Sequence, residues 1–167
     1  RRQRQMCIRD SHKDLNAHFL GDSMRYFDGV HMGIAVDTER GLMVPTVFDA
    51  DRLSLAELAK ASKEVIKEAQ AGTISPDKLK GASFTVSNLG PTGIESFTPV
   101  INPPQTGILG VCSLTRRVKE VNGAAVFYPC IPLSLTFDHR ALDGAPAARF
   151  LHELCTALEN FELLLVK

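Results

Sequence analysis

Residues 134–154 read SLTFDHRALDGAPAARFLHEL, and this stretch decides the fold. A largely apolar, strand-like run ends at Phe137, and a helix-like pattern begins near Gly144. Between them lie four ionisable side chains, Asp138, His139, Arg140 and Asp143. We therefore expect a strand that delivers polar groups to its end, followed by a tight turn and a helix.

Each of these side chains has an ordinary structural interpretation. Asp143 stands where it could cap the helix, and Asp138 and Arg140 could form a local ion pair of small energy. His139 reads equally well as a hydrogen-bonded structural histidine or as a functional one. It is the only side chain of the four that exchanges its proton near pH 7. The residues alone leave both interpretations open.

The N-terminal half of the chain predicts two strands and one clear helix. Residues 31–38 and 42–50 have strand patterns joined by a glycine turn, and Pro45 restricts the second to a sheet edge or an irregular strand. The helix covers residues 54–72, where a serine N-cap and a glutamate three residues later supply a capping box.

The C-terminal half predicts further strands and a closing helix. The segments are a helical turn at 75–81, strands at 83–90, 106–114 and 131–139, a hairpin at 117–129 with a type I′ turn at Asn122 and Gly123, and a helix at 145–161. We expect the closing helix to be buried through Leu151, Leu154, Cys155 and Leu158. The predicted fold class is α/β, a mixed β-sheet with packed helices.

Length and composition are those of one ordinary globular domain. The 167 residues are 44% apolar and 23% charged, and nineteen basic side chains balance nineteen acidic ones. This balance argues against a nucleic-acid-binding surface, and no apolar run is long enough to span a bilayer. The four cysteines lie far apart without metal-ligand spacing, so we expect reduced thiols, three of them in or near the core.

The opening stretch RRQRQMCIRDS differs from the rest of the sequence. It is rich in arginine and poor in acidic residues, which superficially suggests a transit peptide, yet it is short and runs directly into folded-looking sequence. We expect residues 1–11 to be non-native or disordered and residues 12–167 to form the domain.

Three motifs in register resemble the catalytic domain of the dihydrolipoyl acyltransferase component of 2-oxo acid dehydrogenase complexes. They are D-H-R-x-x-D-G at 138–144, FTVSNLG followed by INPPQTGILGV, and AVDTERGLMVPTVF. The resemblance covers about residues 15–167 in the family's order. It does not include the family domain's first segment, so we expect the chain alone to be a poor catalyst.

The resemblance implies a two-layer fold like that of chloramphenicol acetyltransferase. It also implies transfer of an acyl group, which we expect to be acetyl, from dihydrolipoamide to coenzyme A without a metal. The lipoyl group would be carried on a domain absent from this chain. The implied partners are further copies in a homotrimer that builds a larger core, and the 2-oxo acid decarboxylase and dihydrolipoyl dehydrogenase components, with no nucleic acid and no membrane. The implied location is the bacterial cytoplasm, or the mitochondrial matrix in a eukaryote.

The family's chemistry implies a role for each of three residues. A thiol needs a base to become a nucleophile near pH 7, and His139 matches the family's base. Ser87 matches the serine that stabilises the oxyanion from the neighbouring subunit, and Ser96 is our second choice for that hydroxyl. Asp143 matches a residue that holds the histidine loop through an ion pair with an arginine, which we cannot place in this sequence.

The residues around Ser87 also have structural interpretations. Without the motif, Ser87 reads as a strand-end hydroxyl bonded to the backbone. Asn88 and Gly90 read first as turn formers, and contact with substrate is their second role.

Three other interpretations remain open. An antibiotic acetyltransferase of the same fold typically has a second histidine where Asp138 stands. A non-catalytic core scaffold tends to lose the motif histidine, whereas His139 and Ser87 are both present. A metal site at Asp138, His139 and Asp143 lacks a second His or Cys at ligand spacing. The sequence decides neither which acyl group is moved nor the size of the assembled core.

Overall fold

The structure is a computed structural model that describes residues 12–162. In chain order its elements are the 3₁₀ turn η1 (Lys13–Leu15), strands β1 (Ala17–Phe19), β2 (Met24–Tyr26), β3 (Met32–Ile34), β4 (Val36–Thr38), β5 (Gly41–Met43) and β6 (Thr46–Val47), turn η2 (Ala50–Arg52), helix α2 (Leu55–Gln70), turn η3 (Pro76–Leu79), strand β7 (Phe84–Asn88), turn η4 (Gly90–Thr92), strands β8 (Gly107–Val111), β9 (Thr115–Val121), β10 (Ala124–Cys130) and β11 (Leu133–Phe137), and helix α3 (Gly144–Glu159).

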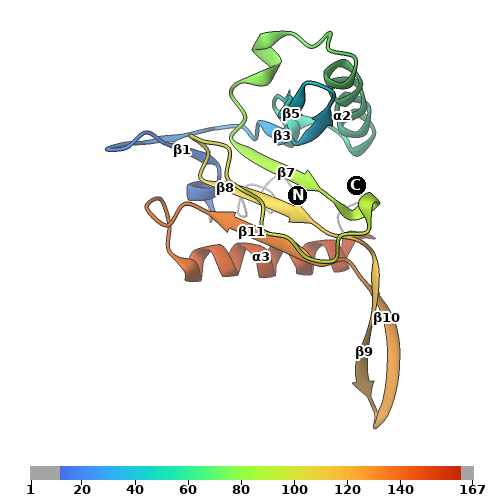
Figure 1. The fold of residues 1–167 in the computed structure, drawn as a ribbon. Helices are drawn as coiled ribbons and strands as arrows, with labels where there is room; N and C mark the ends of the chain where they lie inside the picture. The colour runs from blue at the N-terminus through green and yellow to red at the C-terminus, as the bar shows by residue number, and fades with distance from the viewer. Residues whose placement is uncertain (1–11, 163–167) are drawn as a thin grey trace.

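A five-stranded mixed sheet lies at the centre of the molecule (Figure 1). Its strand order is β11-β8-β7-β3-β6. Strand β7 runs parallel to both of its neighbours, whereas β11 and β6 are antiparallel to theirs. The predicted α/β fold with a mixed sheet is confirmed.

Both strands predicted in the N-terminal half are divided in two. Pro45 separates β5 from β6, and β6 is a two-residue strand at the sheet edge, as the proline predicted. The other predicted strand is divided after β3, which enters the central sheet, while β4 pairs with β5 in a separate hairpin. At the break, Ala35 N donates a hydrogen bond to Val86 O (2.9 Å).

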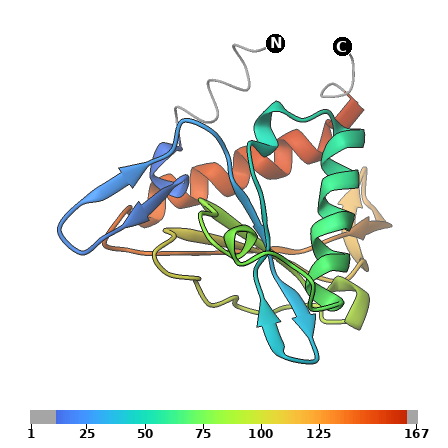
Figure 2. The same cartoon turned by 90° about the horizontal axis from the view of Figure 1, so that it is seen from above.

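Both long helices cover the same face of the sheet. Phe84 packs in the cluster that includes Ala147 of α3, and Met32 packs in the cluster that includes Val65 of α2. Met32 and Phe84 are partners in the β3–β7 register, and strand partners point to the same side of a sheet. The molecule therefore has two layers, helices on sheet (Figure 2).

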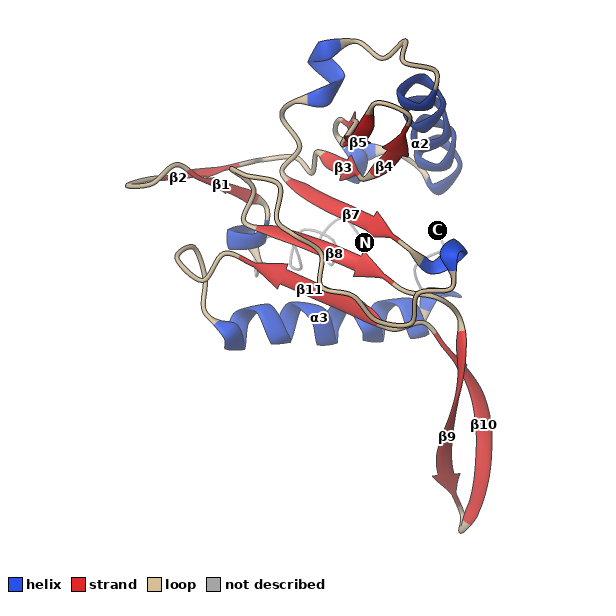
Figure 3. Cartoon of the chain, viewed as in Figure 1, coloured by secondary structure: helices blue, strands red, loops and turns tan. Residues whose placement is uncertain are grey.

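The opposite face of the sheet is crossed by residues 94–105, which we call the strap (Figure 3). Thr85 Oγ1 donates a hydrogen bond of 2.6 Å to Gln105 Oε1 at one end of the strap. Nearer its middle, Phe97 lies over Gly110, where an added Cβ would come within 2.9 Å of the phenyl Cζ. The strap can approach the sheet because position 110 has no side chain.

The β9–β10 hairpin extends away from the body of the molecule as an arm (Figure 1). Asn122 and Gly123 both have positive φ, at 52° and 79°, and link directly paired strands, which confirms the predicted type I′ turn. Phe127 and Val118 are cross-strand partners and remain 71% and 54% exposed. Within residues 12–162, nothing covers this apolar pair.

The closing helix is confirmed, but the predicted burial of its side chains is only partial at three positions and wrong at Leu158. Leu151, Leu154 and Cys155 are only half-buried, and Leu158 is 48% exposed. A helix of 16 residues is about 24 Å long, whereas a five-residue strand such as β11 spans only about 17 Å. The last turn of α3 therefore extends beyond the strands that bury its first turns.

The cysteines within residues 12–162 are free thiols, as expected. Cys112 is buried, and Cys130 and Cys155 are half-buried. Burial, together with the nearby Glu159 carboxylate, raises the pKa of the Cys155 thiol, so little thiolate is present at neutral pH. Cys7 lies outside the described residues. In the described part of the chain, neither long helix has the length and apolar character needed to cross a membrane.

The capping box predicts a measurable share of the stability of α2. Ser54 Oγ accepts a hydrogen bond from Glu57 N, and Ser54 N donates one of 2.8 Å to Glu57 Oε2. Ser54→Ala should lower the free energy of unfolding by about 0.5–2 kcal/mol, measured by urea denaturation, because it removes the hydroxyl that accepts from Glu57 N and donates to Glu57 Oε2 (2.6 Å). Ser62→Ala, inside the same helix, is the control and should be neutral or slightly stabilising. Equal effects of the two changes would contradict the prediction.

Candidate functional site

Ser87 and His139 leave the sheet at opposite ends. Ser87 pairs with Gly110 near the end of β7. His139 follows β11, whose last residue, Phe137, pairs with Gly107. Gly107 and Gly110 are about 10 Å apart along β8. Strands β7 and β11, on either side of β8, are about 10 Å apart across the sheet. In one chain the hydroxyl and the imidazole are therefore on the order of 14 Å apart or more, which is far beyond hydrogen-bond reach.

The Ser87 side chain is half-buried on the face that the strap crosses. Its hydroxyl has no hydrogen-bond partner among residues 12–162. The alternative interpretation, a strand-end hydroxyl bonded to the backbone, is therefore not what the described chain shows. The hydroxyl is left able to donate to another group.

Asn88 and Gly90 form a turn that fixes the end of β7. Asn88 Oδ1 accepts a hydrogen bond of 2.8 Å from Gly90 N. A Cβ at Gly90 would lie 2.7 Å from the carbonyl oxygen of Cys112, so only glycine fits at this close approach. The prediction that both residues are turn formers is confirmed. Through this turn they hold the strand end that carries Ser87.

His139 lies on the turn between β11 and α3 and is 71% exposed at its side chain. Its Nδ1 is 3.8 Å from Asp143 Oδ1, which is an ion-pair contact but too long for a hydrogen bond. A proton on Nδ1 would face this carboxylate and leave Nε2 free to accept a proton from a ligand. The arrangement is suited to a base that works on a group entering from solvent.

Asp143 occupies the N-cap position of α3, but its side chain does not fill the capping role considered for it. Its backbone is extended (φ −84°, ψ 165°) at the N-cap position of α3, but its side chain makes no capping hydrogen bond. Within the described residues its ion pair is with His139. The carboxylate is thus directed to the histidine rather than to the helix end.

Asp138 and Arg140 form the predicted local ion pair on either side of His139. Arg140 Nε and Nη2 donate to the two carboxylate oxygens of Asp138 at 2.9 and 2.7 Å. These hydrogen bonds hold the pKa of Asp138 below its ordinary value. The guanidinium also lies 4.4 Å from the ring centroid of Phe19, a contact between residues far apart in the chain that no sequence pattern predicts. The pair therefore fixes the backbone that carries the imidazole.

Two other predicted possibilities gain no support from the geometry. Ser96 is exposed on the strap, and no contact in the described structure joins it to Ser87. Within residues 12–162 no group of three His, Cys, Asp or Glu side chains converges as a metal site would require.

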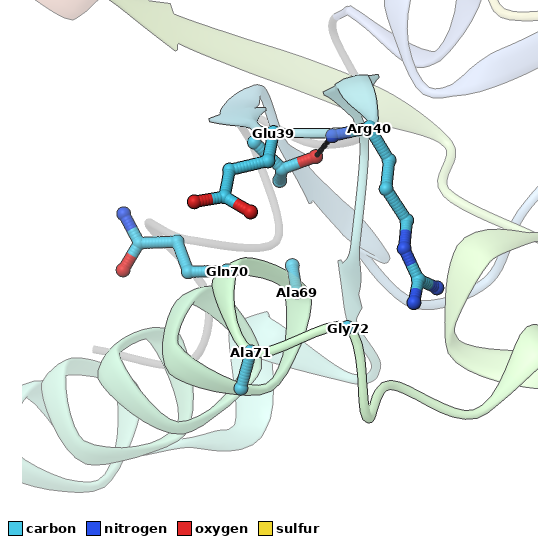
Figure 4. A pocket seen from close by; sticks show the side chains of 7 residues that line it. Glu39, Arg40, Ala69, Gln70, Ala71 and Gly72 are labelled. Carbon is cyan, nitrogen blue, oxygen red and sulfur yellow. Dashed lines mark hydrogen bonds between the residues drawn. The ribbon is translucent and has the colours of Figure 1, made fainter.

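A small cavity of about 100 Å³ lies away from all of these residues, between the β4–β5 turn and residues 69–72 (Figure 4). Arg40 N donates to Thr38 Oγ1 across its rim (3.2 Å). The Arg40 guanidinium lies against Gly72, at the C-terminal end of α2, where a cation is favourable. We interpret the cavity as part of this helix ending.

Comparison with known proteins gives a consistent result over almost the whole chain. Residues 6–166 match the family model for the catalytic domain of 2-oxoacid dehydrogenases acyltransferase. The chain is 43% identical over 150 residues to the dihydrolipoyllysine-residue acetyltransferase component of the acetoin cleaving system of Bacillus subtilis (strain 168), covering 90% of this chain and 38% of that protein. It is also 43% identical over 152 residues to the mitochondrial succinyltransferase component of 2-oxoglutarate dehydrogenase complex 1 of Arabidopsis thaliana, covering 91% and 33%. The chain thus spans about a third of the length of these relatives.

Solved structures show the same similarity. Dihydrolipoamide acetyltransferase of Azotobacter vinelandii, solved to investigate the role of a serine, a histidine and an asparagine in its catalytic mechanism, has a TM-score of 0.86 and 36% identity. The match covers 96% of this chain and 68% of that one. The cubic core of a pyruvate dehydrogenase multienzyme complex gives the same TM-score and identity, with 97% and 68% coverage.

The ion pair beside His139 predicts an acid-dependent loss of stability. The pKa of Asp138 is lowered in the folded chain, so its stabilisation is complete above the ordinary Asp pKa of about 3.9 and is lost as the pH falls through the lower, folded-state pKa. Asp138→Asn should therefore unfold at lower urea concentration than the parent chain at pH 5–7, with the difference shrinking below about pH 4. Asp37→Asn, at an exposed site, is the control. A difference that stays constant down to pH 3 would refute this interpretation.

Proposed function

Because the chain belongs to the family of 2-oxoacid dehydrogenase acyltransferase catalytic domains, we propose that it transfers an acyl group between dihydrolipoamide and coenzyme A. The lipoyl group and coenzyme A are the two thiol substrates in this proposal. The lipoyl group would arrive on a separate domain. The residues proposed for the chemistry are His139 and Ser87, with Asp143 holding His139.

The observation that carries the proposal is the spacing of these three residues. The serine, histidine and asparagine investigated in the Azotobacter enzyme are separated by 52 and 4 positions, and the same intervals separate Ser87, His139 and Asp143. The third residue differs, because this chain has an aspartate where that enzyme has an asparagine. Both side chains offer an oxygen that can accept a hydrogen bond from the imidazole.

The chemistry proceeds by proton transfer and thiol attack. A free thiol with a pKa of about 8.5 is only slightly ionised at pH 7, so His139 takes the proton from the attacking sulfur. That sulfur attacks the thioester carbonyl carbon, and the Ser87 hydroxyl donates a hydrogen bond to the oxyanion that forms. As the intermediate collapses, the original C–S bond breaks and the imidazolium returns its proton to the leaving sulfur.

This scheme requires more than one copy of the chain. Ser87 and His139 lie at opposite ends of the sheet, so a reacting thioester could contact both only if they came from different subunits. The similarity to a cubic core supports an assembly in which the sites lie between subunits. We propose that the assembly is built from trimers and that the decarboxylase and dihydrolipoyl dehydrogenase components bind around it.

We propose acetyl as the acyl group. Sequence identity does not select it, because an acetyltransferase and a succinyltransferase are equally similar to the chain. The support comes from charge. Residues 89–113 surround the end of β7 and include the strap. They contain no Lys, Arg or His, and Glu95 is their only charged side chain at neutral pH. A succinyl group carries a second carboxylate, which this segment gives no cation to bind.

Substitution of the proposed base and hydroxyl tests the mechanism. In a version of the domain completed with the family's first segment, His139→Ala should reduce acetyl transfer by about 10²–10⁴-fold, and Ser87→Ala by about 10²–10³-fold, because a base or an oxyanion donor is lost. Transfer from acetyl-coenzyme A to dihydrolipoamide can be followed by chromatographic separation of the acetyl-dihydrolipoamide and free coenzyme A that form. The controls are His152→Ala on the exposed side of α3 and Ser96→Ala on the strap. Near-full activity of His139→Ala would refute the mechanism, and a loss in Ser96→Ala instead of Ser87→Ala would move the hydroxyl role to Ser96.

Mixing the two inactive variants tests the sharing of sites between subunits. Co-refolded His139→Ala and Ser87→Ala chains should recover part of the parental activity, because some interfaces then contain one intact His139 and one intact Ser87. Each variant refolded alone is the control. If subunit exchange is verified by mass labels and no activity returns, the two groups act within one chain and the proposed arrangement is wrong.

A further inference from the structure

A phenyl ring occupies the space beside the proposed oxyanion donor. Gly110 is the register partner of Ser87 on β7, and strand partners point to the same side of a sheet. A Cβ built at Gly110 would lie 2.9 Å from Phe97 Cζ and 3.2 Å from its Cε1. Because neighbouring strands are about 4.8 Å apart, the ring lies on the order of 5–8 Å from the Ser87 Cβ.

The strap holds this ring in a fixed position. At its first residue, Ile94 O accepts a hydrogen bond of 2.7 Å from Ser113 N, next to the end of β8. At its last residue, the fully buried Thr85 donates to Gln105, which is 4% exposed. Between these ends, Pro99 is buried against Gly110. A segment tied at both ends and in its middle cannot easily carry the ring away from the sheet.

The chemistry of the proposed function places the acyl group near this ring. The thioester oxygen must lie about 2.7 Å from Ser87 Oγ to accept its hydrogen bond. The first carbon of the acyl chain is two bonds from that oxygen, within about 2.5 Å of it. Phe97 is half-buried, so part of its surface is open to contact a ligand.

Resting on the proposed function, we infer that Phe97 is a specificity-determining residue that limits the length of the acyl chain. Its ring bounds the space next to the Ser87 hydroxyl, where acetyl fits and each further carbon meets the ring. The boundary is rigid because the strap is anchored on both sides of the phenylalanine. Position 110 contributes to it by lacking a side chain, which lets the ring rest on the strand.

The experiment compares acyl chain lengths in the assembled protein. Values of kcat/KM are measured for transfer from acetyl-, propionyl- and butyryl-coenzyme A to dihydrolipoamide by the parent chain, Phe97→Leu and Phe97→Ala. The ratio of propionyl to acetyl transfer should rise by about 10–200-fold in Phe97→Ala, the usual effect of adding or removing room for one methylene, with Phe97→Leu between, and the ratio of butyryl to acetyl transfer should rise in the same direction. Val100→Ala, on the same strap and 87% exposed, is the control and should keep the parental ratio.

Binding of the same three thioesters by isothermal titration gives a second measurement that does not need turnover. The ratio of butyryl- to acetyl-coenzyme A affinity should shift in the same direction in Phe97→Ala. If the parent chain transfers acetyl and both ratios are unchanged in Phe97→Ala, the inference about Phe97 is overturned while the proposed function stands. If a version of the domain completed with the family's first segment transfers no acyl group at all, the proposed function fails, and an unchanged affinity ratio would overturn the inference as well.

Discussion

Strand β8 pairs in parallel with β7 on one side and antiparallel with β11 on the other, and the arrangement of the candidate site depends on this difference. Strands β7 and β11 therefore run in opposite directions, and their C-terminal ends lie at opposite ends of the sheet. One end carries Ser87 and the other carries His139, so no movement short of breaking the sheet could bring them together in one copy. The helices cover a single face, which leaves the face of Ser87 to the strap. The sheet register thus makes assembly a condition of the proposed chemistry rather than an addition to it.

Features that depend on residues close together in sequence could be predicted. The capping box at Ser54 and the turn at Asn122 and Gly123 are each specified by local hydrogen bonds and by backbone conformations that these residues favour, and both are present. The turn at Asn88 is of the same kind. The ion pair of Asp138 with Arg140 spans only two residues. The local sequence pattern therefore predicted the turn between β11 and α3 that carries His139. The resemblance to a family was needed to propose a role for that histidine.

Features that depend on register or on distant packing could not be predicted in this way. Strands β1 and β2 have three residues each, which is too short for any alternation to be recognised. The exposure of Leu158 follows from the length of α3 relative to the strands beneath it. The contact between Phe97 and Gly110 required the strand pairing and the path of the strap. A glycine inside a strand pattern does signal a close approach of another group, and that signal at Gly110 would have pointed to the contact.

The β9–β10 arm has a consequence for amide hydrogen exchange. Its backbone hydrogen bonds join only two strands, and its apolar pair of Val118 and Phe127 is uncovered within the described chain. A two-stranded ribbon without further support is marginally stable, so its local opening free energy is close to zero and its amides exchange almost as fast as those of an unfolded segment. Contact with another molecule would raise the opening free energy of the ribbon by the free energy of that contact, and the amides would exchange correspondingly more slowly. The amides of residues 115–130 are therefore an intrinsic reporter of whether the arm is covered in solution.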